Sequence, residues 1–217
     1  MKDILYFLRL LCVNNNTTWF HANRPLYLQN KEAFEKIVND LIVEISKFDS
    51  SVKDVTAKEC MFRINRDIRF SQDKSPYKNH FGAYIAQGGK NAYVGGYYLH
   101  IEPDNSMVAG GIYMPPSDVL LKLRTAIYEN PKMFISIIED KGYKELFGAL
   151  DGEQLKAAPR GFPSSFEHID LLKYKSYVCM KPISDERFED DDVFKIALES
   201  FKKMKDLNDF LNKALSH

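Results

Sequence analysis

The spacing of apolar residues predicts helices at both ends of the chain and in its middle. Near the N-terminus, apolar residues recur at intervals of three and four and share one helical face; they are Ile4, Leu5, Leu8, Leu11 and Cys12. A longer amphipathic helix, entered near Asn23 and Pro25, keeps this spacing from Phe34 to Phe48. Two further helices begin at Ser117 and Pro131. The acidic residues 184–192 suit the N-terminus of a final helix, whose buried face is Phe194, Ala197, Leu198, Phe201, Met204, Leu207 and Leu211.

Between these helices the spacing of apolar residues changes from the helical period to one typical of strands. Segments rich in aromatic and β-branched residues, separated by turn residues, are predicted strands; they are residues 62–71, 81–87, 93–102, 107–114 and 176–181. We therefore expect an α+β fold in which a mostly antiparallel sheet packs with N-terminal, middle and C-terminal helices. No repeat or long linker divides the sequence, so residues 1–217 are predicted to form a single domain.

The composition is that of an ordinary globular protein, with 45% hydrophobic and 28% charged residues. Thirty basic residues balance thirty acidic ones, so the chain has no overall field that would attract nucleic acid or an anionic membrane. No apolar run is long enough to span a bilayer. Cys12, Cys60 and Cys179 form no CxxC or Cys/His pattern, and we expect them in the core of a reduced, cytoplasmic protein.

Charged residues alternate with core-like ones in residues 63–85. If this segment is a strand, Arg66 has the same parity as the apolar residues Ile64 and Ile68 and points toward the core side of the sheet. A buried guanidinium stays charged and is costly without a partner, so Arg66 needs an acceptor. That acceptor is either a carboxylate from elsewhere in the chain or a bound anionic group.

The same segment has a local excess of positive charge. From Arg63 to Lys78 there are five basic and two acidic residues, a net charge of +3. Guanidinium groups bind carboxylate or phosphate in bidentate fashion, and lysine adds a point charge, so these residue types suit a small anion. The predicted ligand-binding residues here are Arg63, Arg66, Asp67, Arg69, Lys74 and Lys78. No P-loop or dinucleotide fingerprint is present, and no cofactor is predicted.

The next hairpin contains a candidate acid–base group. Tyr98, His100 and Glu102 share one face of the predicted strand. With a loop at residues 103–106, the facing pairs are Glu102–Met107, His100–Ala109 and Tyr98–Gly111. His100 would then stand over an open patch of sheet, as either a general base or a structural histidine, with Tyr77 as a second proton-transfer candidate. A metal site is not predicted, because no ligand spacing relates His100 to the other histidines considered, which are His21, His80 and His168.

The stretch RINRDIRFSQDKSPY, residues 63–77, fits the pattern RxxRDxRFxxxKxPY. In this motif, and in the stretches GYYLHIEP, GGIYMPP and LKAAPRGFP, the chain resembles the domain of unknown function 2461 family over nearly its whole length. The N-terminal stretch TTWFHANRP departs slightly, because acidic or helix-favouring residues are more usual at Thr18 and Pro25. The resemblance implies a family without an established activity, substrate or cofactor.

Three further polar or amphipathic residues are candidate ligand contacts. They are Trp19 and Arg24, where a helix end approaches the sheet, and Arg160, in a loop rich in proline and glycine. Each also has a structural explanation, as a half-buried, capping or solvated residue.

Three classes of function stay open. The first is binding of, or catalysis on, a small anionic ligand. The second is a structural or protein-interaction domain in which the arginines and aspartates form an internal network. The third is a nucleic-acid module, in which basic residues contact phosphates and aromatic rings stack on bases; the zero net charge counts against this class. The sequence does not indicate the oligomeric state.

Overall fold

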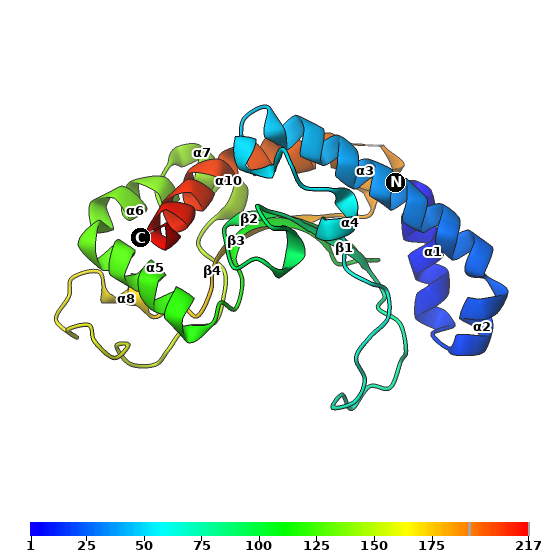
Figure 1. Ribbon diagram of the computed structural model, residues 1–217, viewed down its shortest axis with the longest axis horizontal. Helices are drawn as coiled ribbons and strands as arrows, with labels where there is room; N and C mark the ends of the chain where they lie inside the picture. Colours follow the sequence, from blue (N-terminus) through cyan, green and yellow to red (C-terminus); the bar gives the residue numbers. More distant parts are fainter. Residues whose placement is uncertain (191, 217) are drawn as a thin grey trace.

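The computed structural model describes residues 1–190 and 192–216 and has an α+β fold. Four antiparallel strands form one sheet in the order β1-β2-β3-β4 (Figure 1). The strands are β1 (Phe81–Ile85), β2 (Gly96–Ile101), β3 (Ser106–Ile112) and β4 (Tyr177–Ile183).

Along the chain, the helices come before β1, between β3 and β4, and after β4. Those before it are α1 (Lys2–Val13), α2 (Thr17–Ala22), α3 (Arg24–Ser46) and α4 (Ala57–Cys60), with a short 3-10 turn η1 (Ser50–Val52). A second such turn, η2 (Gly89–Asn91), connects β1 to β2. Between β3 and β4 come α5 (Ser117–Glu129), α6 (Pro131–Ile138), α7 (Lys141–Phe147) and α8 (Ile169–Leu172). The chain ends with α9 (Glu186–Glu189) and α10 (Val193–Leu215).

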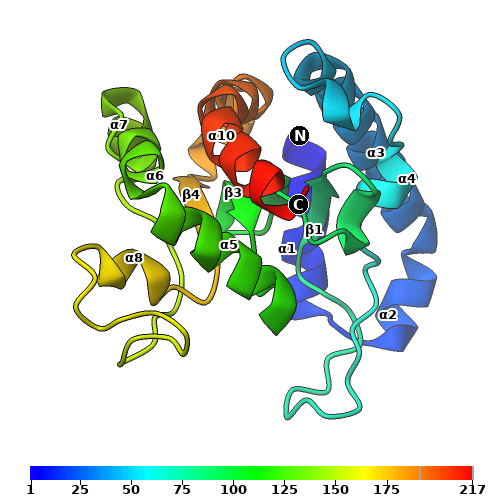
Figure 2. The same cartoon turned by 60° about the vertical axis from the view of Figure 1, so that its left-hand side comes forward.

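Helices α3 and α10 lie together over one face of the sheet (Figure 2). Alternate strand residues point toward them and are buried: Ala83, Ile85, Tyr97, Leu99, Ile101, Val108, Ile112, Tyr177 and Cys179. The opposite side faces a concavity, with α5 at one end and the irregular residues 62–80 at the other (Figure 1). The core therefore lies on one side of the sheet, and the other side is left for a site.

Glycines allow α10 to approach β2 and β3 closely. A Cβ atom at Gly110 would lie 2.6 Å from Sδ of Met204, so a larger residue fits only if the Met204 side chain or the helix moves. The buried side chain of Asn208 donates from Nδ2 to the carbonyl of Gly96 at 3.0 Å and accepts at Oδ1 from the amide of Gly111 at 3.0 Å. One helix residue thus satisfies backbone groups of two neighbouring strands.

Most predicted elements are confirmed. The N-terminal helix, the long helix after Asn23, the helices near Ser117 and Pro131 and the final helix are all present. The strands predicted at residues 81–87, 93–102, 107–114 and 176–181 correspond to β1 to β4. Of the cysteines, Cys60 and Cys179 are buried as expected, but Cys12 is exposed, because it lies at the solvent edge of the apolar face of α1.

The strand predicted at residues 62–71 is wrong. This segment makes one isolated bridge, Asn65 with Tyr77, and the residue before it, Met61, makes another with Ala83 of β1. Phe70, expected on the core side, is 95% exposed. The Phe62 amide still bonds the Gly82 carbonyl of β1 at 2.9 Å, but from Ile64 onward the chain pairs with its own continuation.

The β2–β3 register also differs from the expected one. The observed pairs are His100 with Met107, Tyr98 with Ala109 and Gly96 with Gly111. The connection comes one residue earlier than predicted, because the Ser106 hydroxyl bonds both the amide and the carbonyl of Glu102 at 3.0 and 2.8 Å. A shift by two residues keeps every side chain on its predicted face.

In the described part of the chain, no helix is both long and apolar enough to cross a lipid bilayer.

Replacing Asn208 by alanine should destabilise the fold. Asn208→Ala leaves a buried carbonyl and a buried amide without partners, which costs about 2 to 4 kcal/mol of unfolding free energy. Urea denaturation followed by circular dichroism measures the change. The exposed Asp206 of the same helix gives the control Asp206→Ala; equal effects of the two substitutions would contradict this role for Asn208.

Candidate functional site

Residues 62–80 form an irregular arm that runs from α4 to β1 at one end of the concavity (Figure 1). Two backbone hydrogen bonds join its sides, from the Arg66 amide to the Pro76 carbonyl at 2.9 Å and from the Lys78 amide to the Ile64 carbonyl at 2.8 Å. Tyr77 is buried at the base.

The base of the arm is fastened to the N-terminal helices. Asn15, in the turn between α1 and α2, donates to the Tyr77 carbonyl and to Oδ1 of Asn79, both at 2.9 Å. The same side chain accepts from the Tyr77 amide at 3.1 Å. The Tyr77 ring stacks on Phe20 with 3.8 Å between centroids. Tyr77 is the residue predicted above as a second proton-transfer group. In the structure its side chain is buried and its ring packs against Phe20.

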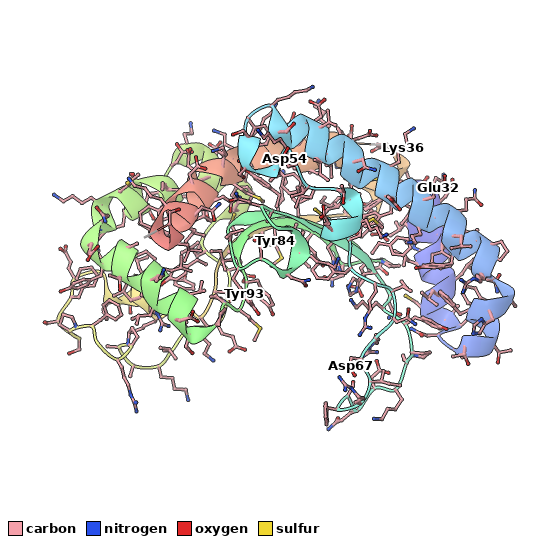
Figure 3. The ribbon with its side chains drawn as sticks, in the orientation of Figure 1. Glu32, Lys36, Asp54, Asp67, Tyr84 and Tyr93 are labelled. Atoms are coloured by element: carbon pink, nitrogen blue, oxygen red, sulfur yellow. The ribbon has the colours of Figure 1, made fainter. Side chains whose placement is uncertain are left out.

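The charged residues of the motif pair with one another near the tip of the arm. Arg66 forms an ion pair with Asp73, and Arg69 pairs with Asp67 at 2.6 Å. Lys74 donates to the Ile68 carbonyl at 3.0 Å. Figure 3 shows Asp67 at the far end of the arm, well away from the sheet.

Arg66 therefore has the acceptor that its charge requires, although in a different place from the expected one. Its partner is seven residues further along the same arm, and the side chain remains 27% exposed. The core-side position predicted for the guanidinium is wrong, because the segment is not a strand of the sheet. Hydrogen bonds from Ser75 and the pair with Arg66 hold the pKa of Asp73 well below its usual range.

The uncovered face of the sheet forms the floor of a cleft of about 730 Å³. Aromatic side chains supply much of its wall, and they are Phe62, Tyr84, Tyr93, Tyr98 and Tyr113. Tyr84 and Tyr93 mark this side of the sheet in Figure 3. Small residues on β3, such as Ala109 and Gly111, leave space above the floor. Mostly apolar clefts with a few polar groups are the usual form of small-molecule sites.

Three side chains at the end of β2 form a hydrogen-bonded chain beside this cleft. The Tyr98 hydroxyl lies 2.8 Å from Nδ1 of His100, and Nε2 of His100 lies 3.0 Å from Oε2 of Glu102. A carboxylate can only accept, so the neutral imidazole donates from Nε2 and accepts the Tyr98 proton at Nδ1. Burial alone would raise the pKa of Glu102, but hydrogen bonds from His100 and Asn105 outweigh it and lower that pKa. Burial raises the pKa of Tyr98.

A second imidazole lies against this chain. The rings of His80 and His100 have centroids 4.3 Å apart. Burial, followed by the proximity of His100, lowers the pKa of His80 to about 4, so its ring is neutral at pH 7. His80, His100 and Glu102 each offer a ligand atom within 4.8 Å of the other two, so these residues could hold a metal ion.

Sequence reasoning missed the pairing of His80 with His100. The nineteen intervening residues include an irregular connection, so no local spacing relates the two histidines. The available signal was parity: Gly82 pairs with His100 across β1 and β2, and His80, two residues earlier, extends the same face.

Two lysines border the cleft in different ways. Lys90 uses its ammonium group to bond the carbonyls of Lys58 and Glu59 at 3.3 and 3.1 Å. Lys78 is half-buried, with Nζ 5.4 Å from the centroid of the Phe62 ring. Burial and the nearby charge of Arg63 lower the pKa of Lys78.

The residues predicted from the sequence are thus divided among several places. Lys78 and His100 line the cleft. The others lie elsewhere: Arg63, Arg66, Asp67, Arg69, Lys74 and Tyr77 in the arm, Trp19 half-buried with its ring 6.4 Å from that of Phe7, Arg24 exposed at the start of α3, and Arg160 exposed in its loop. Ligand binding by any of these residues stays a prediction.

Comparison with known proteins identifies a family but no characterised relative. Residues 3–210 match the model of a family described as a conserved hypothetical protein, DUF2461. Neither the curated proteins nor the solved structures give a match.

Removing the carboxylate of Asp73 should loosen the tip of the arm. In Asp73→Asn the guanidinium of Arg66 loses its charged partner, and the hydrogen bonds from Ser75 to residue 73 weaken. The tip of the arm should therefore open more often. We expect chymotrypsin to cleave after the exposed Phe70 several times faster than in the wild type. The control is Gln72→Ala, which changes an exposed neighbour. An unchanged cleavage rate in Asp73→Asn would show that these pairs do not hold the tip.

Proposed function

The chain belongs to the DUF2461 family, and we propose that it binds a small anionic ligand, one that carries a phosphate or carboxylate group, in the cleft over the open face of the sheet. The ligand's charged group would contact Lys78 at the arm side of the cleft. Its remaining part would lie against the aromatic wall. Chemistry on the ligand, if it is a substrate, would take place at the polar floor formed by Tyr98 and His100, with Glu102 hydrogen-bonded to His100 beside the cleft.

The observation that supports this proposal most directly is that the half-buried ammonium group of Lys78 lies near no opposite charge among the described residues. Within residues 1–190 and 192–216, its ammonium group has no carboxylate partner, and its described contact is the face of the Phe62 ring. The neighbouring Arg63 adds charge of the same sign. A half-buried cation without a counter-charge is unfavourable in the free protein, and an anionic ligand would remove that penalty.

The lining of the cleft adds a requirement on the rest of the ligand. Phe62, Tyr93 and Tyr113 present ring faces and edges, and Met107 and Met180 add polarisable thioethers. A ligand with an apolar or aromatic part beside its anionic group fits such a wall better than a bare ion does. Phosphorylated metabolites, nucleotides and carboxylic acids, many of which combine an anionic group with an apolar or aromatic part, are the compounds to screen.

A second role is supported for the arginines and aspartates of the arm. Arg66 pairs with Asp73 and Arg69 with Asp67, so these charges already satisfy each other without a ligand. We infer that this part of the motif is an internal network that shapes the tip of the arm. The two roles are compatible, because Lys78 belongs to the base of the arm and not to that network.

Lys78→Met separates ligand binding from folding. Methionine keeps the apolar stem and removes the charge, so we expect the free variant to be at least as stable as the wild type. A ligand that stabilises the wild type by about 2.7 kcal/mol at 100 times its dissociation constant should shift the melting temperature of Lys78→Met little or not at all.

Differential scanning fluorimetry across the three compound classes measures these shifts. The matched control is Lys74→Met, which removes an equal charge from the exposed part of the arm and should keep the full shift. The proposal fails if no anion stabilises the wild type, or if Lys78→Met keeps the shift.

A further inference from the structure

Two histidines that line the cleft, His80 and His100, meet Glu102 where the neighbouring strands β1 and β2 end. Gly82 pairs with His100, and His80 lies two residues before Gly82, opposite the end of β2. One ligand atom from each of His80, His100 and Glu102 lies within 4.8 Å of the other two. From this geometry we propose that the three side chains bind one divalent transition-metal ion at the floor of the cleft.

The observed separations suit a shared ion. Nε2 of His100 and Oε2 of Glu102 are 3.0 Å apart. Two ligand atoms bound about 2.1 Å from one ion lie roughly 3.0 Å apart at a right angle and roughly 3.4 Å apart at the tetrahedral angle. An ion can therefore replace the proton shared by these two atoms once the imidazole turns so that Nε2 points at the ion rather than at Oε2. The His80 ring makes no hydrogen bond within the described residues and has its lone pair available for the ion.

The side chains around the cluster are placed to orient its ligands. Tyr98 lies 2.8 Å from Nδ1 of His100, so in the metal-bound state the imidazole would donate from Nδ1 to the Tyr98 oxygen and present Nε2 to the ion. Asn105 donates to Oε2 of Glu102 at 2.7 Å and fixes the carboxylate. Such outer contacts set the tautomer and orientation of metal ligands in known sites.

Two imidazoles and one carboxylate specify the class of metal. This ligand set is typical of zinc and of other first-row divalent ions, whereas Mg²⁺ and Ca²⁺ prefer oxygen ligands. Three protein ligands leave at least one coordination position, and His80 and His100 line the cleft, so that position is open to small molecules. The cluster therefore has the form of a reactive site rather than of a closed structural one.

A metal also resolves a charge conflict in the cleft, an argument that rests on the proposed function. With neutral imidazoles, the metal-free cluster has the single negative charge of Glu102, which repels an anionic ligand. A divalent ion changes the formal charge of the cluster from −1 to +1. The ligand's anionic group would then lie between two positive charges, the ion and Lys78, with the ion as Lewis acid.

Metal binding can be tested without any knowledge of the ligand. Isothermal titration of Zn²⁺ into the metal-free full chain, prepared without a polyhistidine tag, should show one site per chain. His80→Ala and Glu102→Gln should each weaken it at least 100-fold, and Tyr98→Phe roughly 10- to 100-fold. The controls are His21→Ala, an exposed histidine of α2, and Mg²⁺ in place of Zn²⁺, which should not compete.

Melting curves recorded in chelator show whether each variant is folded, and the visible spectrum of bound Co²⁺ reports the ligand set independently. The inference is overturned if Zn²⁺ does not bind, or if binding persists unchanged in folded His80→Ala and Glu102→Gln. Lys78→Met should keep full Zn²⁺ affinity. Zinc binding without an anion-induced shift, in metal-free and zinc-loaded protein alike, would overturn only the proposed function, and an anion shift without zinc binding would overturn only the metal site.

Discussion

The close approach of α10 to β2 and β3 determines which face of the sheet is available. Gly110 leaves room for Met204, and Asn208 satisfies backbone groups of both strands from a fully buried position. With this face occupied by α3 and α10, the polar side chains of β2 are directed to the opposite face. The cleft, its aromatic wall and its histidines are a consequence of that packing.

The sequence predicts the elements of this fold well because the helices and the four strands have strong periodicity. It fails for the arm because the alternation of residues 62–71 indicates an extended chain but not its partner. Asp73 competes for Arg66, and the Lys78 amide takes the Ile64 carbonyl, so the segment folds back on itself. An ion pair between residues seven apart and a backbone hydrogen bond between residues fourteen apart thus accompany a fold that the local pattern does not predict.

The candidate site was predictable only in part, for a related reason. His100 could be placed on the open face from strand parity, although its partner on β3 is Met107 and not the small Ala109 that was expected. His80 could not, because its position depends on how β1 and β2 pair across a connection that contains the turn η2. The charge of Arg66 correctly predicts that this residue has an acceptor. The acceptor is Asp73 of the same arm, and not a group on the core side of the sheet, because residues 62–71 do not form a strand.

The amide of Asn15 joins two parts of the molecule that are far apart in sequence. It bonds both Tyr77 and Asn79, the residues on either side of Lys78. The only cleft lysine whose ammonium group is not engaged by backbone carbonyls, among the described residues, is thus positioned from the turn between the first two helices. Three hydrogen bonds of one side chain thus tie the backbone on both sides of Lys78, and with it the charge of the cleft, to the N-terminal helices.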